Sequence, residues 1–369
     1  MLFFTCNRLN LQKAFLNLEI INRSKYRGMN KKEITIYDIA EKLKLSPSTV
    51  SRGLQDHPAI NKNTKQKIND LAFELGYRSN KFASNLRKQR TNTIGVIIPK
   101  LDSLFMSSVI SGIEKVANNA GYNLIISQSF ESQEKEQTNA STMYNSRVDG
   151  LIISLSNETK DFKHLDMFVD KGIPLIFFDR VTDNPLTTKV VIDNFKAGHI
   201  ATTHLIEQGC RNILHITGNL TRNVYNDRLS GFKKAIEDNG LALTSDSVIS
   251  NTLREEDIRD CLENDILKRK PLPDGIFIAN DFAAAFTIVK LKEAGLRVPE
   301  DVAVIGFNND LISKVTEPPI STINYPGKEM GESVARILVN QLEQKENTSI
   351  TSTIILDTEL IVRKSSQKR

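Results

Sequence analysis

The polar side chains between residues 46 and 52 have the types that bind DNA. They belong to Ser48, Thr49, Ser51 and Arg52. Ser46 is a favourable N-cap and Pro47 a favourable first helical residue, so a helix is predicted here with these groups on its outer face. Short hydroxyls let a helix approach bases and phosphates closely, and arginine donates to guanine or phosphate oxygens. The pattern is typical of a major-groove helix, although any amphipathic helical pair shares part of it.

A preceding helix is predicted to position this segment. Its inward residues recur at i, i+3, i+4 and i+7, and they are Ile36, Ile39, Ala40 and Leu43. Thr35 can cap this helix, and the side chain of Asp38, three positions later, can accept a hydrogen bond from the cap residue in return. On the second helix Val50 and Leu54 turn inward at i and i+4. The first helix is therefore a scaffold for the second.

A third helix completes a small predicted core. It is capped by Asn61 and stopped by Gly76, and its inward residues are Ile68, Leu71, Ala72 and Leu75. Residues 77–90 follow, and they are too polar and basic for a buried element. Because they stand directly before a clear strand, we expect them to form a hinge.

These segments resemble the LacI/GalR (lactose repressor/galactose repressor) family of bacterial transcription regulators. The shared signature runs through Ile39-Ala40, Ser46 to Arg52, Gly76-Tyr77, Asn80, and Ala83 to Leu86, and the similarity continues to Arg363. Two residues depart from the family pattern. Lys44 stands where many members have glycine in the turn, and Ser79 stands where many have proline.

The resemblance implies roles for individual residues. Pro47, Ser48 and Arg52 would contact bases, whereas Thr49 and Ser51 would lie nearer the phosphates. Ala83 and Leu86 would lie on a hinge helix in the minor groove, where a leucine from each subunit would kink the duplex. The full set that we expect at the DNA is Thr35, Tyr37, Pro47, Ser48, Thr49, Ser51, Arg52, Asn61, Asn80, Ala83 and Leu86.

The distribution of charge favours the same function. Residues 29–90 carry 13 Lys and Arg against 6 Asp and Glu, a net charge of +7. Residues 91–369 carry a net charge of −6. A basic segment on an acidic body is typical of a domain that binds duplex DNA, because neutralising phosphates supplies most of the sequence-independent affinity.

The larger part of the chain alternates apolar runs with helical stretches. The runs are 93–99, 123–127, 150–154, 174–178, 190–193, 212–218, 275–280, 302–307 and 353–360, and the helical stretches include 106–120, 196–208, 227–239 and 281–294. Near-continuous apolar runs of this length predict strands buried on both faces of parallel sheets. The fold class is therefore an all-α helix-turn-helix headpiece, followed by the hinge helix that the resemblance implies and by an α/β core with doubly wound parallel sheets.

The resemblance implies that this core has two lobes like those of periplasmic sugar-binding proteins, with a small effector between them. The carboxyl ends of parallel strands gather ligand groups at such a place. The expected effector contacts are Phe105, Asp179, Arg228, Asn280 and Asn308. Aromatic faces and bidentate polar groups suit a sugar. Asn308 departs from the aspartate that is common in the family, and Asp179 as a turn cap, Arg228 as a surface charge and Phe105 as core remain alternatives.

The sequence gives little support to other classes of protein. No glycine-rich phosphate loop or G-x-S-x-G elbow follows a strand, and no histidines or cysteines have zinc-ligand spacing, so we expect no enzyme, cofactor or metal. Three scattered cysteines indicate a reducing cytoplasm, and no apolar run is long enough for a membrane helix. A transport binding protein would share the lobes but needs export and no basic headpiece. It remains the alternative.

We therefore predict a cytoplasmic, homodimeric regulator of transcription, most simply a repressor of carbohydrate-utilisation genes, acting at a near-palindromic operator. The expected boundaries are 29–78 for the DNA-binding domain, 79–91 for the hinge and 92–369 for the core. Within the core, one lobe takes 92–191 and 324–345, and the other takes 192–323 and 350–363. Residues 1–28 are either a leader that precedes the true start at Met29 or a disordered or weakly helical arm.

Overall fold

The computed structural model describes residues 34–77, 90–182, 187–343 and 351–368, which form two units. We call residues 34–77 the headpiece and the described residues from 90 onward the core. The two units are considered separately. The expected leader at 1–28 and the expected hinge contacts Asn80, Ala83 and Leu86 lie outside the described residues.

The headpiece consists of three short helices around one small core. They are α2 (Ile36–Leu43), α3 (Pro47–Leu54) and α4 (Lys62–Glu74). The fully enclosed side chains are Ile39, Ala40, Val50, Ile68 and Ala72. Each helix starts at its predicted cap. The amide and hydroxyl of Thr35 both donate to Asp38 Oδ2, Ser46 Oγ accepts from the Thr49 amide, and Asn61 Oδ1 accepts from the Thr64 amide.

The turn between α2 and α3 forms with lysine in a left-handed conformation. Lys44 has φ 54° and ψ 40°, and the next amide, that of Leu45, donates to the Ala40 carbonyl oxygen. A residue with a Cβ costs about 1–2 kcal/mol in this region. The departure at Lys44 therefore leaves the helix-turn-helix geometry intact at a cost that the rest of the headpiece offsets.

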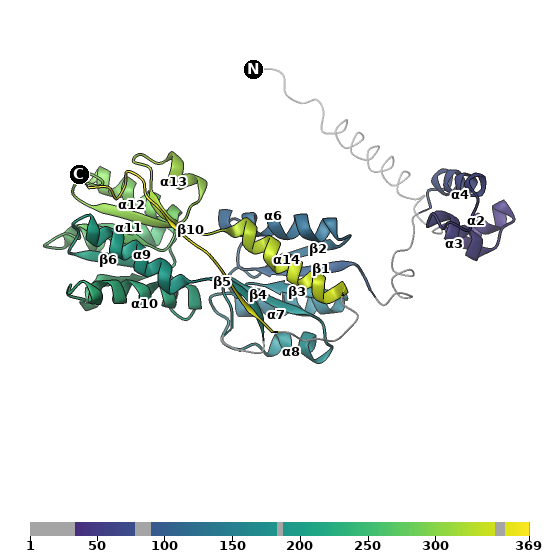
Figure 1. Cartoon of the computed structure of the whole chain (residues 1–369), viewed down its shortest axis with the longest axis horizontal. Coiled ribbons are helices and arrows are strands. Elements are labelled where there is room, and N and C mark those ends of the chain that lie inside the picture. Colours follow the sequence, from purple (N-terminus) through teal and green to yellow (C-terminus); the bar gives the residue numbers. More distant parts are fainter. Residues whose placement is uncertain (1–33, 78–89, 183–186, 344–350, 369) are drawn as a thin grey trace, which may run out of the picture. The chain divides into compact units, whose positions relative to one another are not determined.

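The first lobe of the core is a parallel six-stranded sheet in the order β11-β5-β4-β3-β1-β2. Its strands are β1 (Thr93–Ile98), β2 (Asn123–Gln128), β3 (Gly150–Ile153), β4 (Leu175–Phe178), β5 (Thr188–Ile192) and β11 (Thr353–Leu356). Its helices are α6 (Leu104–Asn119), α7 (Gln133–Asn145), α8 (Lys163–Asp170) and α14 (Gly327–Glu343). Helices α6 and α14 cover one face of this sheet, and α7 and α8 cover the other (Figure 1). The apolar side chains of these helices pack against the strands on both faces.

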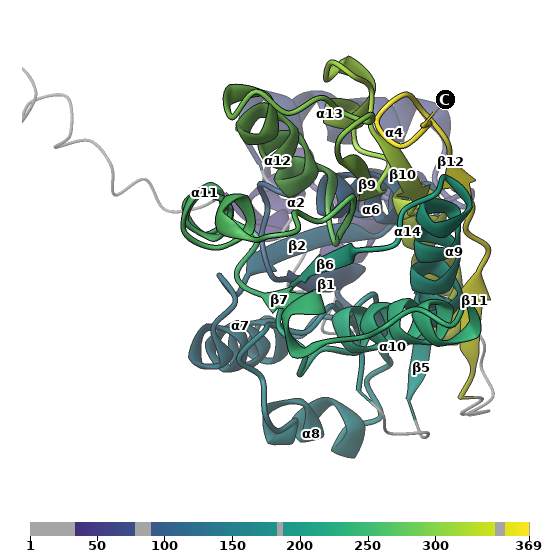
Figure 2. The same cartoon turned by 90° about the vertical axis from the view of Figure 1, so that its left-hand side faces the viewer.

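The second lobe repeats this plan in the order β12-β10-β9-β8-β6-β7. Its strands are β6 (Ile213–Thr217), β7 (Val248–Ser250), β8 (Gly275–Ile278), β9 (Ala303–Asn308), β10 (Ser321–Asn324) and β12 (Leu360–Ile361), of which β12 alone among them is antiparallel to its neighbour. Its helices are α9 (Asn194–Glu207), α10 (Asn223–Asp238), α11 (Glu255–Asn264), α12 (Asp281–Glu293) and α13 (Leu311–Val315). Figure 2 shows α9 and α10 on the opposite side of this sheet from α11 and α12.

Glycines allow the helix pairs of both lobes to touch through their backbones. A Cβ on Gly112 of α6 would lie 2.2 Å from the Lys328 carbonyl oxygen in the first turn of α14. A Cβ on Gly198 of α9 would lie equally close, at 2.2 Å, to the Arg228 carbonyl oxygen of α10. The second contact fixes the position of Arg228, because α10 can approach α9 only where no side chain intervenes.

The chain crosses between the lobes after β5, after β10 and after β11. The expected strand at 353–360 is thus two strands in different sheets, and 350–363 does not belong wholly to the second lobe as expected. The reason lies in the connecting residues. Thr358 Oγ1 donates to the Asn324 carbonyl oxygen, and the Asn324 amide donates to the Glu359 carbonyl oxygen, which turns the chain onto β10. Otherwise the predicted fold class, a helix-turn-helix and two parallel α/β lobes, is confirmed.

Candidate DNA-contacting face and effector site

Helix α3 presents polar groups on the face that it does not bury. Val50 and Gly53 are buried against the headpiece core, whereas Ser48 and Arg52 are exposed. Pro47, Thr49 and Ser51 lie half-buried at the edge of the same face. The Ser46 hydroxyl lies 2.8 Å from the hydroxyls of both Ser48 and Thr49, which orients these groups at the start of the helix.

The other expected DNA contacts of the headpiece stand at helix starts. The Thr35 and Asn61 side chains cap α2 and α4, so their hydrogen bonds already hold the helix ends in place. Tyr37, in the first turn of α2, is 68% exposed. Backbone amides at helix N-termini favour anions, so these starts suit phosphate groups.

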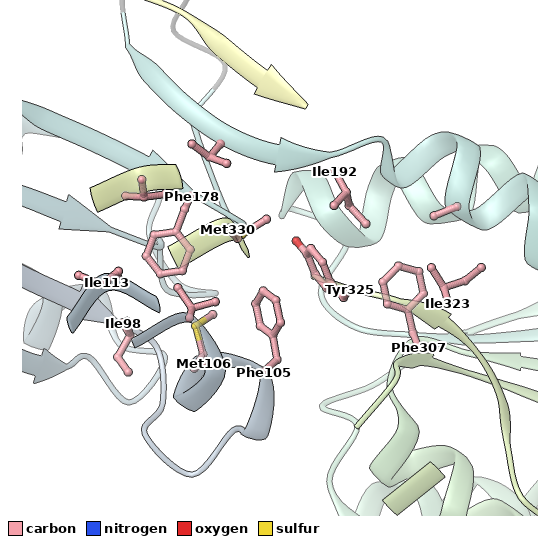
Figure 3. Close-up of a cluster of buried hydrophobic side chains, with 14 of the residues drawn as sticks. Ile98, Phe105, Met106, Ile113, Phe178, Ile192, Phe307, Ile323, Tyr325 and Met330 are labelled. Carbon is pink, nitrogen blue, oxygen red and sulfur yellow. The ribbon is translucent and has the colours of Figure 1, made fainter. Parts of the chain in front are cut away.

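Three of the five expected effector contacts come together where the lobes meet. Asp179 Oδ1 accepts a hydrogen bond of 2.6 Å from the Tyr325 hydroxyl. The Tyr325 ring stacks on Phe105, with 4.2 Å between the ring centroids. Figure 3 shows Tyr325 between Phe105 and Phe307, with Phe178 and Met106 on the first-lobe side. Asp179 directly follows β4, and Phe105 lies in the first turn of α6.

Arg228 enters the same region from the second lobe. Its guanidinium carbon lies 3.5 Å above the centroid of the Phe307 ring and 5.5 Å from that of Tyr325. Nε donates to Asn194 Oδ1 at 2.9 Å, and Nη1 donates to the Ala279 carbonyl oxygen at 3.2 Å. Arg228 is only 3% exposed, so its reading as a surface charge is wrong. Among the described residues it has no ion pair, and neutral acceptors and aromatic faces surround it.

Burial sets the titration of these groups. Removal from water raises the pKa of the Asp179 carboxyl, an effect that Arg180, the Tyr325 hydroxyl and Arg228 oppose. Burial lowers the pKa of the Arg228 guanidinium, against the attraction of Tyr325, Tyr225 and Asp179. The site therefore holds a carboxyl and a guanidinium that a suitable ligand would stabilise in their charged forms.

Asn280 and Asn308 lie at the carboxyl ends of neighbouring strands of the second sheet: Asn280 is the second residue after β8, and Asn308 is the last residue of β9. Asn280 Oδ1 caps α12 by accepting from the Ala283 amide, and Asn308 Nδ2 donates to Asp310 Oδ2 at 3.2 Å. Arg228 contacts the residue before each asparagine, because it bonds Ala279 and lies on Phe307. The two amides therefore flank the Arg228 end of the site, with part of their hydrogen-bonding capacity used locally.

Sequence reasoning missed two tyrosines that link the lobes. Tyr325 contacts Asp179 and Phe105, and the Tyr225 hydroxyl accepts from Arg180 Nη2 at 3.3 Å. Arg180 also donates to Glu131 Oε2 at 2.7 Å. Tyr325 directly follows the polar end of β10, and Tyr225 lies in the first turn of α10. These positions could have marked them, but nothing in the sequence indicates their partners.

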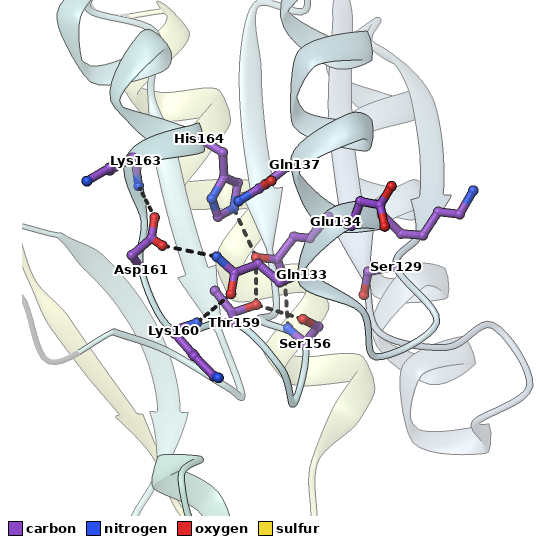
Figure 4. A network of polar contacts seen from close by, with 12 residues as sticks. Ser129, Gln133, Glu134, Gln137, Ser156, Thr159, Lys160, Asp161, Lys163 and His164 are labelled. Carbon is purple, nitrogen blue, oxygen red and sulfur yellow. Dashed lines mark hydrogen bonds and ion pairs between the residues drawn. The ribbon is translucent and has the colours of Figure 1, made fainter.

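A second set of inter-lobe hydrogen bonds lies beside the site. The loop after β3 is fixed by the buried Glu136 carboxylate, which accepts from the Ser156 amide and the Thr159 hydroxyl and lies 3.0 Å from His164 Nε2. Figure 4 shows Ser156, Thr159 and His164 converging on this point. The loop then offers the carbonyl oxygens of Asn157 and Thr159 to side chains before α10 in the second lobe. The network thus presets one contact surface between the lobes.

Asp281, the first residue of α12, contacts the loop that follows Asn308. The carboxyl is fully buried, Oδ1 accepts from the Thr322 hydroxyl at 2.7 Å, and Oδ2 accepts from the Asp310 amide at 2.8 Å. Burial raises its pKa to about 7. An ordinary aspartate in the unfolded chain titrates near 4.

The fold should therefore lose stability as the pH rises from about 4 to 7, because in this window the folded protein holds a proton that the unfolded chain releases. Asp281→Asn has no carboxyl to titrate at this position, so its free energy of unfolding should not fall in this way. Relative to the wild type, the free energy of unfolding of the variant should rise by up to about 4 kcal/mol between pH 4 and pH 8. Urea unfolding of both proteins at several pH values measures the difference. Asp301→Asn is the control, since Arg297 lowers the pKa of that half-buried carboxyl to about 2. A pH-independent difference for Asp281→Asn would contradict the assignment.

Within the described ranges, no helix has the length and apolar character needed to cross a membrane. In the same residues, no three histidine, cysteine or acidic side chains gather as metal ligands.

Known proteins resemble the chain over both units. Residues 35–80 match the family described as "Bacterial regulatory proteins, lacI family", and residues 202–366 match a "Periplasmic binding protein-like domain". The HTH-type transcriptional repressor PurR of Pasteurella multocida (strain Pm70) is 30% identical over 336 residues, covering 91% of this chain and 99% of the relative.

Two solved structures share the fold. A transcriptional regulator CelR–cellobiose complex has a TM-score of 0.66 at 25% identity and covers 90% of this chain and 100% of its own. The Lac repressor dimer bound to operator and the anti-inducer ONPF has a TM-score of 0.77 at 22% identity, with coverages of 91% and 99%.

The chain belongs to the LacI family of bacterial transcription regulators. It is a DNA-binding regulator of the repressor type, and its relatives are regulators rather than enzymes.

Proposed function

We propose that this regulator binds a near-palindromic operator as a homodimer and that a small effector between the lobes of the core changes its operator affinity. The observation that carries the proposal is that one chain contains both an outward polar face on α3 and, in its core, a buried site of opposite charges at the lobe boundary. The first supplies groups that read bases, and the second supplies groups that respond to a ligand.

At the DNA, Pro47, Ser48 and Arg52 contact bases, and Thr49 and Ser51 lie toward phosphates. Their exposure on one face of α3 supports these roles. Thr35, Tyr37 and Asn61 add backbone contacts from the starts of α2 and α4. One recognition helix covers few base pairs, so selectivity across a genome needs two copies and two half-sites. The hinge roles of Asn80, Ala83 and Leu86 rest on the sequence resemblance alone.

At the core, Phe105, Asp179 and Arg228 form the centre of the effector site, with Asn280 and Asn308 at its edge. A sugar fits this mixture because its apolar face stacks on an aromatic ring while its hydroxyls bond to carboxylate, guanidinium and amide groups. The CelR structure contains cellobiose, which supports a saccharide. The PurR relatives make a purine base the second candidate, since a flat ring with N–H donors also suits Phe105 and Asp179. If the effector is a saccharide, the regulated genes are those of carbohydrate utilisation. The regulator acts on them in the cytoplasm.

Exposed apolar side chains support the homodimer. On α12 and α13 they are Phe282, Val289, Leu311 and Val315, and near α6 and β2 they are Leu101, Leu104, Ile125, Ile126 and Phe130. We call the first set the α12–α13 patch. The sequence of α12 is apolar on nearly all sides, although this helix buries only one face in its own lobe. Apolar patches of this kind mark protein interfaces, and the occupant proposed here is a second copy of this chain.

A charge in the α12–α13 patch should separate the dimer. Leu311 is 66% exposed, so Leu311→Glu costs little in the monomer but buries an unpaired carboxylate in the interface. We expect the dissociation constant to rise by about 100-fold or more, measured by sedimentation equilibrium. Ile355→Glu is the matched control, because Ile355 is 61% exposed on β11, at the other edge of the first sheet from β2. Unchanged assembly of Leu311→Glu would place the interface elsewhere.

The function is tested by selecting random DNA duplexes on the purified full-length protein, alone and with cellobiose, D-xylose or hypoxanthine. We expect one enriched motif with two related half-sites, and a change in its enrichment with one compound. Enrichment that is independent of every compound would reject the proposed effectors. Absence of an enriched motif under all conditions would reject the DNA-binding role itself.

A further inference from the structure

Tyr325 occupies the point where the chain passes from the second lobe to the first. It follows β10 of the second sheet and precedes α14, which packs against α6 of the first lobe. Its side chain is 5% exposed. Any relative movement of the lobes must therefore change the surroundings of this ring.

The ring contacts residues of both lobes. In the first lobe its hydroxyl donates to Asp179 Oδ1 at 2.6 Å, and its face stacks on Phe105 at an interplanar angle of 21°. In the second lobe its edge meets Phe307, at 5.8 Å between centroids and 89° between planes. Figure 3 shows the hydroxyl end of Tyr325 directed away from Phe307. The phenol thus closes the space between the lobes.

These first-lobe contacts are the ones that a ligand would need. A flat ring on Phe105 with a hydroxyl directed to Asp179 satisfies the proposed site without any ligand. We propose that the Tyr325 phenol is a built-in occupant of the effector site, and that an effector binds by displacing this phenol from Asp179 and Phe105. The inference rests on the proposed effector site and adds a competitor to it.

The chemistry of the displaced bond limits which ligands succeed. Burial and the neighbouring Asp179 raise the pKa of the Tyr325 hydroxyl far above its usual range, so the phenol stays protonated and remains a donor. When it leaves, Asp179 retains the Ser154 hydroxyl at 3.4 Å. A ligand without a donor would leave this buried acceptor unsatisfied, which is unfavourable. The site should therefore select rings that present a hydroxyl or N–H group at the edge facing Asp179.

The first test needs no ligand. Tyr325→Phe keeps the ring and removes only the hydroxyl, so the effector-free core should open more often. We expect amide hydrogen exchange in residues 101–110 and 176–182 to rise roughly tenfold in the full-length protein. Tyr225→Phe is the matched control, because it removes an inter-lobe phenol that bonds to Arg180 and not to Asp179. Unchanged exchange in both segments of Tyr325→Phe would overturn the proposal.

The second test measures affinity by calorimetry with cellobiose, D-xylose and hypoxanthine. If the phenol competes, Tyr325→Phe should bind the compound that binds the wild type roughly tenfold more tightly, because a larger fraction of the protein is open. Weaker binding would make Tyr325 a direct effector contact and would overturn displacement, while leaving the effector site in place. The exchange measurement decides the proposal even when no compound in this panel binds. Failure of the proposed function would appear separately, as loss of DNA selectivity in the wild type.

Discussion

Arg52→Ala should lower the affinity of the regulator for its selected duplex by about 5- to 150-fold per half-site, since one bidentate arginine–guanine pair contributes about 1–3 kcal/mol of base discrimination. Arg52 lies exposed on the last turn of α3, outside the headpiece core, so the fold should be unaffected. Fluorescence anisotropy on the selected duplex and on duplexes with single base changes measures both affinity and preference. The preference at one position of each half-site should be lost.

Lys67→Ala is the control for charge alone. Lys67 is exposed on α4, and its removal takes away the same single positive charge without touching α3. It should weaken binding to all duplexes about equally and leave the base preference unchanged. If Arg52→Ala and Lys67→Ala behave alike, Arg52 acts only through its charge and does not read a base.

Asp179→Asn should shift the response of operator binding to higher effector concentrations while leaving effector-free operator binding intact. The variant keeps the shape of a side chain that is 5% exposed, but it loses the charge and one acceptor at the centre of the site. Charge-assisted hydrogen bonds are roughly twice as strong as neutral ones, so effector affinity should fall about 10-fold or more. Titration of the protein–operator complex with the effector found by selection measures the response.

Asp193→Asn provides the matched control. Asp193 directly follows β5, the strand next to β4, and its exposed carboxylate caps α9 by accepting from the Lys196 amide at 2.8 Å. The same substitution there should leave the response unchanged, because the amide oxygen still caps the helix. A wild-type response in Asp179→Asn, or an equal shift in both variants, would remove Asp179 from the effector site.

The elements that were predictable are those set by local patterns. Residues 46–54 carry a cap, a helix-compatible proline and inward Val50 and Leu54, and they form α3 as expected. Apolar runs such as 93–98 are buried on both faces of a sheet and form parallel strands as expected. In both cases the information lies within one segment of the chain, where sequence periodicity reports it directly.

What could not be predicted depends on contacts between distant segments. The apolar run after residue 352 reads as one strand, but the bonds of Thr358 and Glu359 to Asn324 divide it between two sheets. Likewise, Tyr325 meets Asp179 and Phe105 only because α14 returns to the first lobe. Strand pairing and lobe crossing have no local signature, so neither feature is visible before the fold is known.

The geometry of the effector site was accessible only in part. Strand ends marked Asp179, and a helix start marked Phe105, but the depth of Arg228 came from the close contact of α10 with α9 at Gly198. A charged residue on a helix usually lies in water. Its burial among Phe307, Tyr225 and Tyr325 turns a solvated charge into a group that a ligand can stabilise.

The central claim, that two copies of α3 read a defined DNA sequence, is tested most directly by comparing the affinity of the full-length protein for its selected duplex and for the same duplex with one half-site scrambled. At physiological salt we predict that the intact duplex binds at least about 1,000-fold more tightly. Equal affinity for the two duplexes, with and without effector, would contradict the account.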